Sequence, residues 1–212
     1  PELDGSTREL LDRTREVVPR LLELFAGRAI HATWATVGLL FPRDMSERNE
    51  LLPEIRPSYT KPGIDPYAVP VGESEKDDPY HYCPSLIERI ISTPGQELAS
   101  HTFGHYYCLE DGQIAGSFEA DLEASVRAGE LFGRRPRSIV FPRNQHNPEY
   151  EEIMKRAGIR CFRGNPCSFW YEPGNDRSTR FPLRRAGRLL DAYLPVAGDL
   201  IHGWDEVSRG RG

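Results

Sequence analysis

Apolar side chains recur every three or four positions along residues 6–25 and again along residues 118–132, the spacing that gathers them on one face of a helix. Pro19 interrupts the first stripe, so we expect it to kink or split that helix. Shorter apolar runs lie between the helical stretches and are typical of buried strands. The pattern predicts helices at 6–25, 84–92, 118–132, 148–157 and 183–194, and strands at 29–38, 96–101, 137–141 and 159–162.

These helices and strands alternate along the chain. Alternation of this kind indicates parallel strands joined by helical crossovers. The sequence therefore predicts an α/β fold, as a sheet or a barrel, in a single domain over residues 1–212. Residues 41–82 break the alternation with many Pro, Gly, Asp and Glu residues, and only a short helix is indicated near 46–52. Such a long insertion is unusual unless it is functional, so we expect a loop near the mouth of an active site.

Composition narrows the class of protein. A net charge of −5 over 212 residues argues against a nucleic-acid or anionic-membrane binder. No apolar run approaches the roughly 18 residues that cross a bilayer, and no signal peptide is visible at the start. We therefore expect a cytoplasmic protein without a membrane span. Its cysteines, which form no CxxC pair, are expected as free thiols. The sequence does not indicate an oligomeric state.

The candidate chemistry lies in the segment 101–105, which reads His-Thr-Phe-Gly-His and directly follows a predicted strand. Sites in α/β barrels form in the loops after the strands. His101 and His105 can converge on one cation if the chain turns between them, and neutral imidazole suits zinc, cobalt or nickel. The alternative is a pair of partly exposed loop histidines with no ligand.

The segment 96–105 resembles the H-[ST]-x-x-H motif of the polysaccharide deacetylases, the NodB-homology carbohydrate esterases. Residues 30–38 are similar to a strand of that family that precedes the motif. Residues 140–145, which contain Arg143, stand where the family carries its arginine motif, and residues 157–160 resemble the segment that follows it. The resemblance covers roughly residues 10–162 and implies a distorted (β/α) barrel, in a divergent branch similar to deacetylase-like proteins of surface-polysaccharide biosynthesis.

The resemblance also implies a reaction, which is the metal-dependent hydrolysis of an N-acetyl group from an amino sugar in a glycan or its precursor. His101 and His105 would be metal ligands, most simply for zinc, and Arg143 would orient the general base. His202, in a stretch similar to the family's Leu-x-His element, would be the general acid. An ion pair for Arg143 and an ordinary loop position for His202 remain alternatives.

One part of the family pattern is missing. The family places an aspartate-bearing strand before its first helix, whereas the first helix here begins near residue 6. We expect that this strand, with the aspartate ligand and the base, is absent from the 212 residues. The same departure supports a rival interpretation, a catalytically inactive relative that binds carbohydrate.

Other polar residues carry weaker expectations. Asn144, Gln145 and His146 follow Arg143 and would either bind sugar hydroxyls or satisfy the backbone at the start of the next helix. His31 is expected in a strand, buried or at its edge. His81, between two tyrosines, is expected to pack in the insertion, with stacking on a sugar as the alternative.

Overall fold

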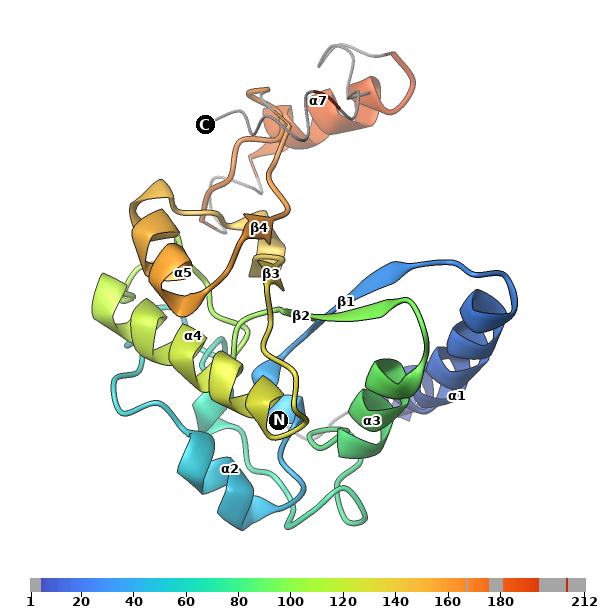
Figure 1. The fold of residues 1–212 in the computed structure, drawn as a ribbon. Helices are drawn as coiled ribbons and strands as arrows, with labels where there is room; N and C mark the ends of the chain where they lie inside the picture. Colours follow the sequence, from blue (N-terminus) through green and yellow to red (C-terminus); the bar gives the residue numbers. More distant parts are fainter. Residues whose placement is uncertain (1–4, 167, 176–180, 195–204, 206–212) are drawn as a thin grey trace. The chain divides into compact units, whose positions relative to one another are not determined.

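The computed structural model describes residues 5–166, 168–175, 181–194 and 205. Contacts divide the chain into two compact units, residues 1–163 and 164–212. The first unit holds the sheet (Figure 1), and residues 101–105 with the histidine pair belong to it. The prediction that all 212 residues form one domain stays a prediction.

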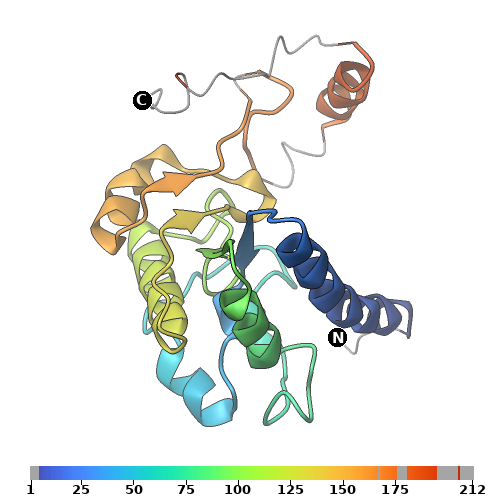
Figure 2. The same cartoon turned by 45° about the vertical axis from the view of Figure 1, so that its right-hand side comes forward.

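A parallel sheet forms the centre of the first unit. Its strands follow one another in chain order: β1 (Ala32–Thr36), β2 (Gln96–Ser100), β3 (Ser138–Ile139) and β4 (Cys161–Phe162). Ala32 pairs with Gln96, and Ser138 pairs with Cys161. Figure 2 shows β3 and β4 as neighbouring yellow and orange arrows. The predicted α/β fold with parallel strands is confirmed.

Each strand is shorter than its predicted range, and the backbone shows why at two of them. Ala29 has φ +50°, a left-handed conformation that interrupts extended structure, so β1 begins only at Ala32. A 3₁₀ turn, η1 (Gly38–Leu40), starts soon after β1 ends. After β3, Pro142 opens the turn η3 (Pro142–Asn144), because proline lacks the N–H that a sheet ladder requires.

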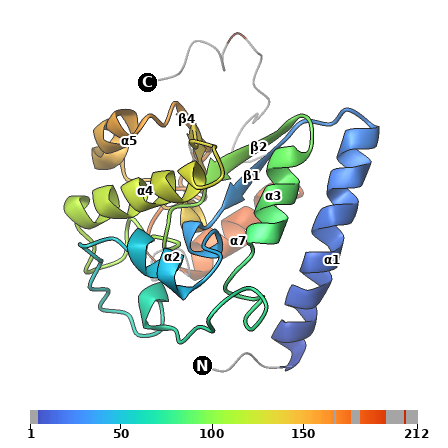
Figure 3. The same cartoon turned by 60° about the horizontal axis from the view of Figure 1, so that its bottom comes forward.

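Helices connect the strands as predicted. They are α1 (Gly5–Gly27), α2 (Met45–Leu51), α3 (Pro84–Ser92), α4 (Ala115–Glu130) and α5 (Glu151–Ala157). Figures 1 and 3 show α1 beside α3 and α4 beside α5. Leu98 of β2 packs in one cluster with α1, α3 and α4, and Ser100 of β2 bonds Ser125 of α4, so these helices cover the same face of the sheet. The loops after the strands are left to build a site.

Helix α1 runs through Pro19 without a break, so of the predicted kink or split the split is wrong. Contacts on both sides of Pro19 hold the helix in place. Arg15 donates from Nη1 to the carbonyl of Pro79 at 2.9 Å, and Leu22 is buried in the core. These contacts offset the loss of the backbone hydrogen bond that Pro19, which has no N–H, cannot donate.

Helix α4 joins two apolar clusters. Ala124 and Ala128 belong to the cluster formed with α1, α3 and β2, whereas Phe118 and Leu122 belong to the cluster formed with β3 and α5. The Phe118 ring stacks on Tyr150 with 4.5 Å between ring centroids. Because both clusters share this helix, its packing sets the position of everything that its buried face touches.

The insertion at 41–82 is folded against the rest of the first unit. It contains α2 and the 3₁₀ turn η2 (Pro66–Ala68), which confirms the expected short helix. Backbone N–H groups of Ser58 and Thr60 donate to the carbonyls of Gly112 and Asp111, at 2.8 and 3.1 Å. The insertion therefore lies beside the segment that follows the histidine motif.

The second unit contains α7 (Pro182–Asp191), which begins one residue before the predicted range 183–194 and ends three residues before its end. Gly187 lies under the ring of Trp170, where an added Cβ would come within 2.1 Å of ring carbon Cε3. Arg184 pairs with Glu172, and the Tyr171 hydroxyl donates to Asp191 at 2.8 Å. These contacts fix the turn at 168–172 against the helix.

Because α4 packs in both apolar clusters, truncation of a side chain on its buried face is expected to cause a large loss of stability. Leu122 is 0% exposed, and Leu122→Ala is expected to lower the free energy of unfolding by ~2–5 kcal/mol. Urea denaturation followed by circular dichroism measures the change. Leu10 in α1 is 65% exposed, so Leu10→Ala, as the control, is expected to change stability by less than ~0.5 kcal/mol. Equal losses in the two variants would contradict the assigned packing.

Candidate metal centre

His101 stands directly after β2, where three strands end together. Its backbone N–H donates to the carbonyl of Thr36 at the end of β1, at 3.0 Å. The N–H of Val140, just past β3, donates to the carbonyl of Ser100 at 3.0 Å. The histidine thus lies at the C-terminal edge of the sheet, which is where α/β folds build their sites.

The chain turns sharply between the two histidines. Thr102 and His105 have φ of +63° and +54°, in the left-handed region that side chains other than glycine seldom adopt. Side-chain hydrogen bonds hold this turn: the Thr102 hydroxyl accepts from the N–H of Tyr106 at 2.6 Å, and Ser100 Oγ accepts from the N–H of Thr102 at 2.9 Å. A turn of this shape brings the two imidazoles to the same side of the loop.

Asp121 of α4 holds the middle of the turn. Its carboxylate accepts from the N–H of Phe103 at 2.7 Å, from the N–H of Gly104 at 2.8 Å and from the Tyr67 hydroxyl at 3.0 Å. Gly104 is required there, because an added Cβ would lie 2.5 Å from the Tyr67 hydroxyl oxygen. Burial raises the pKa of Asp121 to about 6, against the opposing effect of its three donors.

The role of Asp121 was not predicted from the sequence, although a signal was present. Asp121 lies three residues after Phe118 and next to Leu122, on the apolar face of the helix. A carboxylate on a buried face needs hydrogen-bond donors. That requirement marks Asp121 as a residue with a structural partner nearby, but the partner itself lies in another loop.

The two imidazoles lie close together and are uncharged, which metal ligation would require. His101 donates from Nδ1 to the carbonyl of Val140 at 2.7 Å, which leaves the Nε2 lone pair for a ligand. The two rings have centroids 4.9 Å apart. Burial lowers the pKa of His101, and burial, His101 and Arg143 together lower the pKa of His105 to about 4. Both imidazoles are therefore neutral near pH 7, as metal ligation requires.

The donor set is incomplete within the part of the chain that the structure describes. No group of three His, Cys, Asp or Glu side chains there is arranged to hold a metal ion. A catalytic zinc takes three protein ligands and a water. The described residues therefore offer two candidate ligands, and their role stays a prediction.

Arg143 lies next to the pair, on the loop after β3. Its guanidinium stands over the ring of Tyr107, with 4.4 Å from Cζ to the centroid, and forms an ion pair with Glu110 at 3.5 Å. The Tyr107 ring meets the His105 ring edge to face at 5.1 Å. His101, His105 and Arg143 are thus brought together as predicted, whereas His202 lies outside the described residues.

The residues after Arg143 have structural partners. Gln145 is 1% exposed and bonds Leu109 and Glu110, and the His146 ring stacks on Phe162 at 4.5 Å between centroids. Asn147, which was not singled out from the sequence, accepts from the N–H of Glu149 at the start of the next helical turn. Gln145 is thus engaged with the loop after β2, and Asn147 caps the next helical turn. Sugar binding by Asn144, Gln145 and His146 stays a prediction.

The two other candidate histidines do not join the centre. His81 bonds the carboxylate of Asp78 within the insertion, at 2.8 Å from Nδ1. His31 is exposed just before β1, beside Gly95, where an added Cβ would lie 2.6 Å from its ring. His81 therefore packs within the insertion as expected, and His31 lies outside the strand.

Residues 4–162 match the sequence pattern of the polysaccharide deacetylase family. The chain belongs to the polysaccharide deacetylase family. The fold class is accordingly α/β of the deacetylase barrel type. The resemblance to this family that the sequence motifs indicated is confirmed. No curated protein matches this deacetylase-family chain.

Solved structures similar to this deacetylase-family chain include a CE4 family pseudoenzyme from Bacillus anthracis. The wild-type form shares 14% identity at a TM-score of 0.45, over 82% of this chain and 46% of that one. Two mutants share 14% and 13% identity at a TM-score of 0.45, over 70% of this chain and 39% of theirs, and the second is named as having restored enzymatic activity. The chain spans less than half the length of these proteins.

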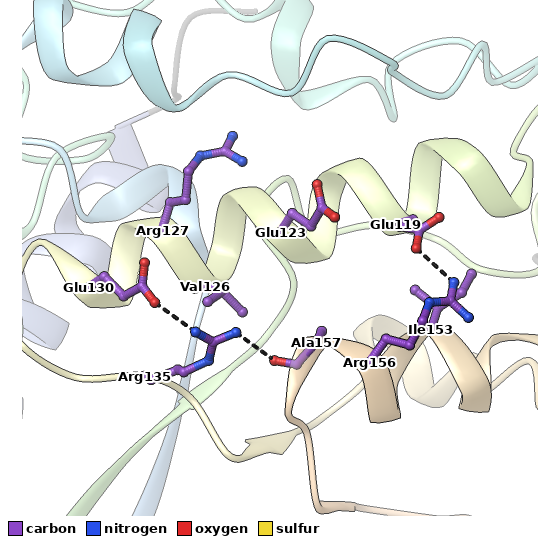
Figure 4. A pocket seen from close by; sticks show the side chains of 9 residues that line it. All are labelled: Glu119, Glu123, Val126, Arg127, Glu130, Arg135, Ile153, Arg156 and Ala157. Carbon is purple, nitrogen blue, oxygen red and sulfur yellow. Dashed lines mark hydrogen bonds and ion pairs between the residues drawn. The ribbon is translucent and has the colours of Figure 1, made fainter.

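A surface hollow of about 420 Å³ lies between α4 and α5 (Figure 4). Ion pairs cross it, Glu119 with Arg156 at 2.7 Å and Glu130 with Arg135 at 3.0 Å. None of the predicted site residues lines it. Exposed pairs of this kind contribute little to stability, so the hollow is a surface feature of the helix pair, separate from the histidine loop.

A search of the helices in the described residues finds none long and apolar enough to cross a membrane. The predicted cytoplasmic location stays a prediction.

The hydrogen bonds of Asp121 predict the effect of removing its charge. In Asp121→Asn the amide NH₂ faces N–H or O–H donors, so at least one donor loses its acceptor, at a cost of ~1–3 kcal/mol. Chemical denaturation at pH 7 measures the loss. Glu123→Gln makes the same chemical change on the exposed face of α4 and serves as the control. If both variants unfold at the same denaturant concentration, Asp121 does not anchor the loop.

The depressed pKa of His105 predicts its titration. Ring signals of His105 in NMR spectra are expected to titrate near pH 4 in the folded protein and near pH 6.5 in urea. Because the folded-state pKa is the lower one, the contribution of His105 to stability is complete above pH 6.5 and is lost as the pH falls towards 4. A folded-state midpoint at 6.5 would show that the ring is solvated and that the loop is open.

Proposed function

We propose that the chain is a metal-dependent hydrolase that removes an N-acetyl group, or another acyl group, from an amino sugar in a polysaccharide or its precursor. Membership of the polysaccharide deacetylase family supports a reaction of this class. The observation that carries the proposal for this chain is the orientation of His101. Its Nδ1–H is held by the Val140 carbonyl, so that Nε2 is left available beside the neutral ring of His105.

His101 and His105 would hold a divalent cation, most simply zinc, with cobalt or nickel as alternatives. When bound, such a cation polarises an amide carbonyl and lowers the pKa of a water molecule. The third ligand and the general base would come from carboxylates outside the described residues. We also propose His202 as the general acid, and this histidine lies outside the described part of the chain.

The protein's own residues prepare this centre. Asp121 holds the backbone of the histidine loop, and the Val140 carbonyl sets the tautomer of His101. Arg143 supplies a fixed positive charge next to His105, and we propose that it orients the carboxylate base. The insertion reaches the same loop, since the Tyr59 hydroxyl oxygen accepts from the N–H of Tyr107 at 2.8 Å. We propose that this part of the insertion contacts the glycan.

Metal analysis tests the centre. The purified protein is expected to bind about one zinc or cobalt ion per chain. His101→Ala and His105→Ala are each expected to weaken binding by more than the ~10–100-fold that loss of an outer-shell partner costs. His31→Ala, which removes an exposed histidine elsewhere, should leave the metal content unchanged. Wild-type protein that takes up no metal would overturn the assignment of the pair as ligands.

Acetate release tests the reaction. With zinc or cobalt present, the protein is expected to release acetate from at least one member of a panel of N-acetylated glycans. Arg143→Ala should reduce the rate without removing the metal, because Arg143 is proposed to orient a base and not to bind the ion. Absence of acetate from every glycan, with the metal bound, would refute the hydrolase.

A second candidate is a catalytically inactive relative that binds carbohydrate. It is supported by the two-ligand donor set of the described residues. Calorimetric titration separates the two functions. Glycan binding that needs no metal and releases no acetate would favour the binding protein.

A further inference from the structure

Glu110 is a buried carboxylate close to the histidine loop, with no role in the proposed function so far. It is 7% exposed, and its Oε1 accepts from Nε2 of Gln145 at 2.9 Å. Gln145 is itself 1% exposed, and its carbonyl oxygen accepts from the N–H of Leu109 at 3.2 Å. One amide side chain therefore ties Glu110 and the backbone before it to the loop after β3.

The charge of Glu110 faces a guanidinium. Arg143 Nη1 lies 3.5 Å from Glu110 Oε1. A carboxylate this deeply buried is costly without an opposite charge nearby. The pair therefore restricts the guanidinium to one place in the loop, and Gln145, two residues after Arg143, holds the carboxylate from the other side.

The guanidinium of Arg143 is connected to His105 through the ring of Tyr107. It stands 4.4 Å over the centroid of Tyr107, and the Tyr107 ring meets His105 at 5.1 Å with an interplanar angle of 81°. The order of contacts is therefore Glu110, Arg143, Tyr107, His105. Glu110, Tyr107 and His105 lie in the loop after β2, whereas Arg143 lies in the loop after β3. These contacts therefore connect the two loops.

The backbone of Arg143 and Asn144 depends on such restraints. Both residues have left-handed φ values, +52° and +55°. Conformations of this kind cost on the order of 1–3 kcal/mol each and persist where surrounding contacts enforce them. Gln145 follows these residues directly and is held by Leu109 and Glu110, which places the enforcing contacts next to the strained pair.

We infer that Glu110 is a positioning residue, which fixes the guanidinium of Arg143 over Tyr107 and thereby holds Tyr107 against His105. The inference rests on the proposed function for its significance, since it deepens the account of the same centre. In the family pattern the arginine orients the general base, whereas in this chain it also forms an ion pair with a carboxylate from the loop after the histidine motif.

Glu110→Gln tests the inference because it removes the charge and keeps an oxygen that can accept from Gln145. In the metal-free protein, the NMR signals of the His105 ring and of Tyr107 are expected to move. Arg143→Gln should move the same signals, and the double variant should show no further change, since both substitutions break one chain of contacts. Where the protein binds zinc, Glu110→Gln should weaken binding by ~10–100-fold, as for other outer-shell partners.

Glu130→Gln is the matched control, because it breaks the surface pair with Arg135 in the hollow of Figure 4. It should leave the His105 and Tyr107 signals and zinc affinity unchanged. Thermal unfolding of each variant confirms that it is folded, and if Glu110→Gln does not fold, Arg143→Gln against Arg143→Lys gives the same readout with the charge kept in one of them.

Unmoved His105 and Tyr107 signals in folded Glu110→Gln would overturn the inference, as would additive shifts in the double variant. These outcomes are distinct from a failure of the proposed function. A protein that binds no metal and releases no acetate can still show the coupled shifts, because they are measured without metal.

Discussion

The carboxylate of Asp121 is the contact on which the histidine loop depends. The segment between His101 and His105 turns through left-handed backbone at residues that are not glycine, so it needs an external restraint. Asp121 supplies one by accepting from two successive N–H groups of the turn. The spacing of the imidazoles is thus set by a helix whose own position is fixed by two apolar clusters. Stability of the core and geometry of the site are linked through α4.

The insertion at 41–82 belongs to the same arrangement. Its Tyr67 hydroxyl completes the hydrogen bonds of Asp121, and its Tyr59 oxygen accepts from the backbone beside His105. Both tyrosines are partly buried, and burial raises the pKa of each, so both remain protonated at physiological pH. A segment that looks irregular in sequence therefore provides part of the wall of the centre. Its length has a structural explanation, since it must reach from β1 to the loop after β2.

The centre combines features of a metal site with an unusual local charge arrangement. Neutral imidazoles, one of them oriented by a backbone carbonyl, are suited to bind a cation. Arg143 places a positive charge nearby, which opposes a cation unless it is balanced. Glu110 forms an ion pair with it at 3.5 Å while leaving the guanidinium over Tyr107. The positive charge of Arg143 still reaches His105, whose pKa it helps to lower.

The sequence by itself determined the alternation of helices and strands, the parallel sheet and the position of the histidine motif after a strand. Those features depend on local periodicity and on the residues that begin and end helices. For example, Pro84 opens α3, and Gly158 closes α5 with φ +88°. It did not determine the ends of the strands, the continuity of α1 through Pro19, or the roles of Asp121 and Glu110. Apart from the strand ends, each of these depends on a partner distant in sequence: Pro79 for α1, Phe103 for Asp121 and Arg143 for Glu110. Only the tertiary structure decided them, because the free energy of a buried charge or a strained turn depends on which groups surround it in space, and periodicity carries no record of those neighbours.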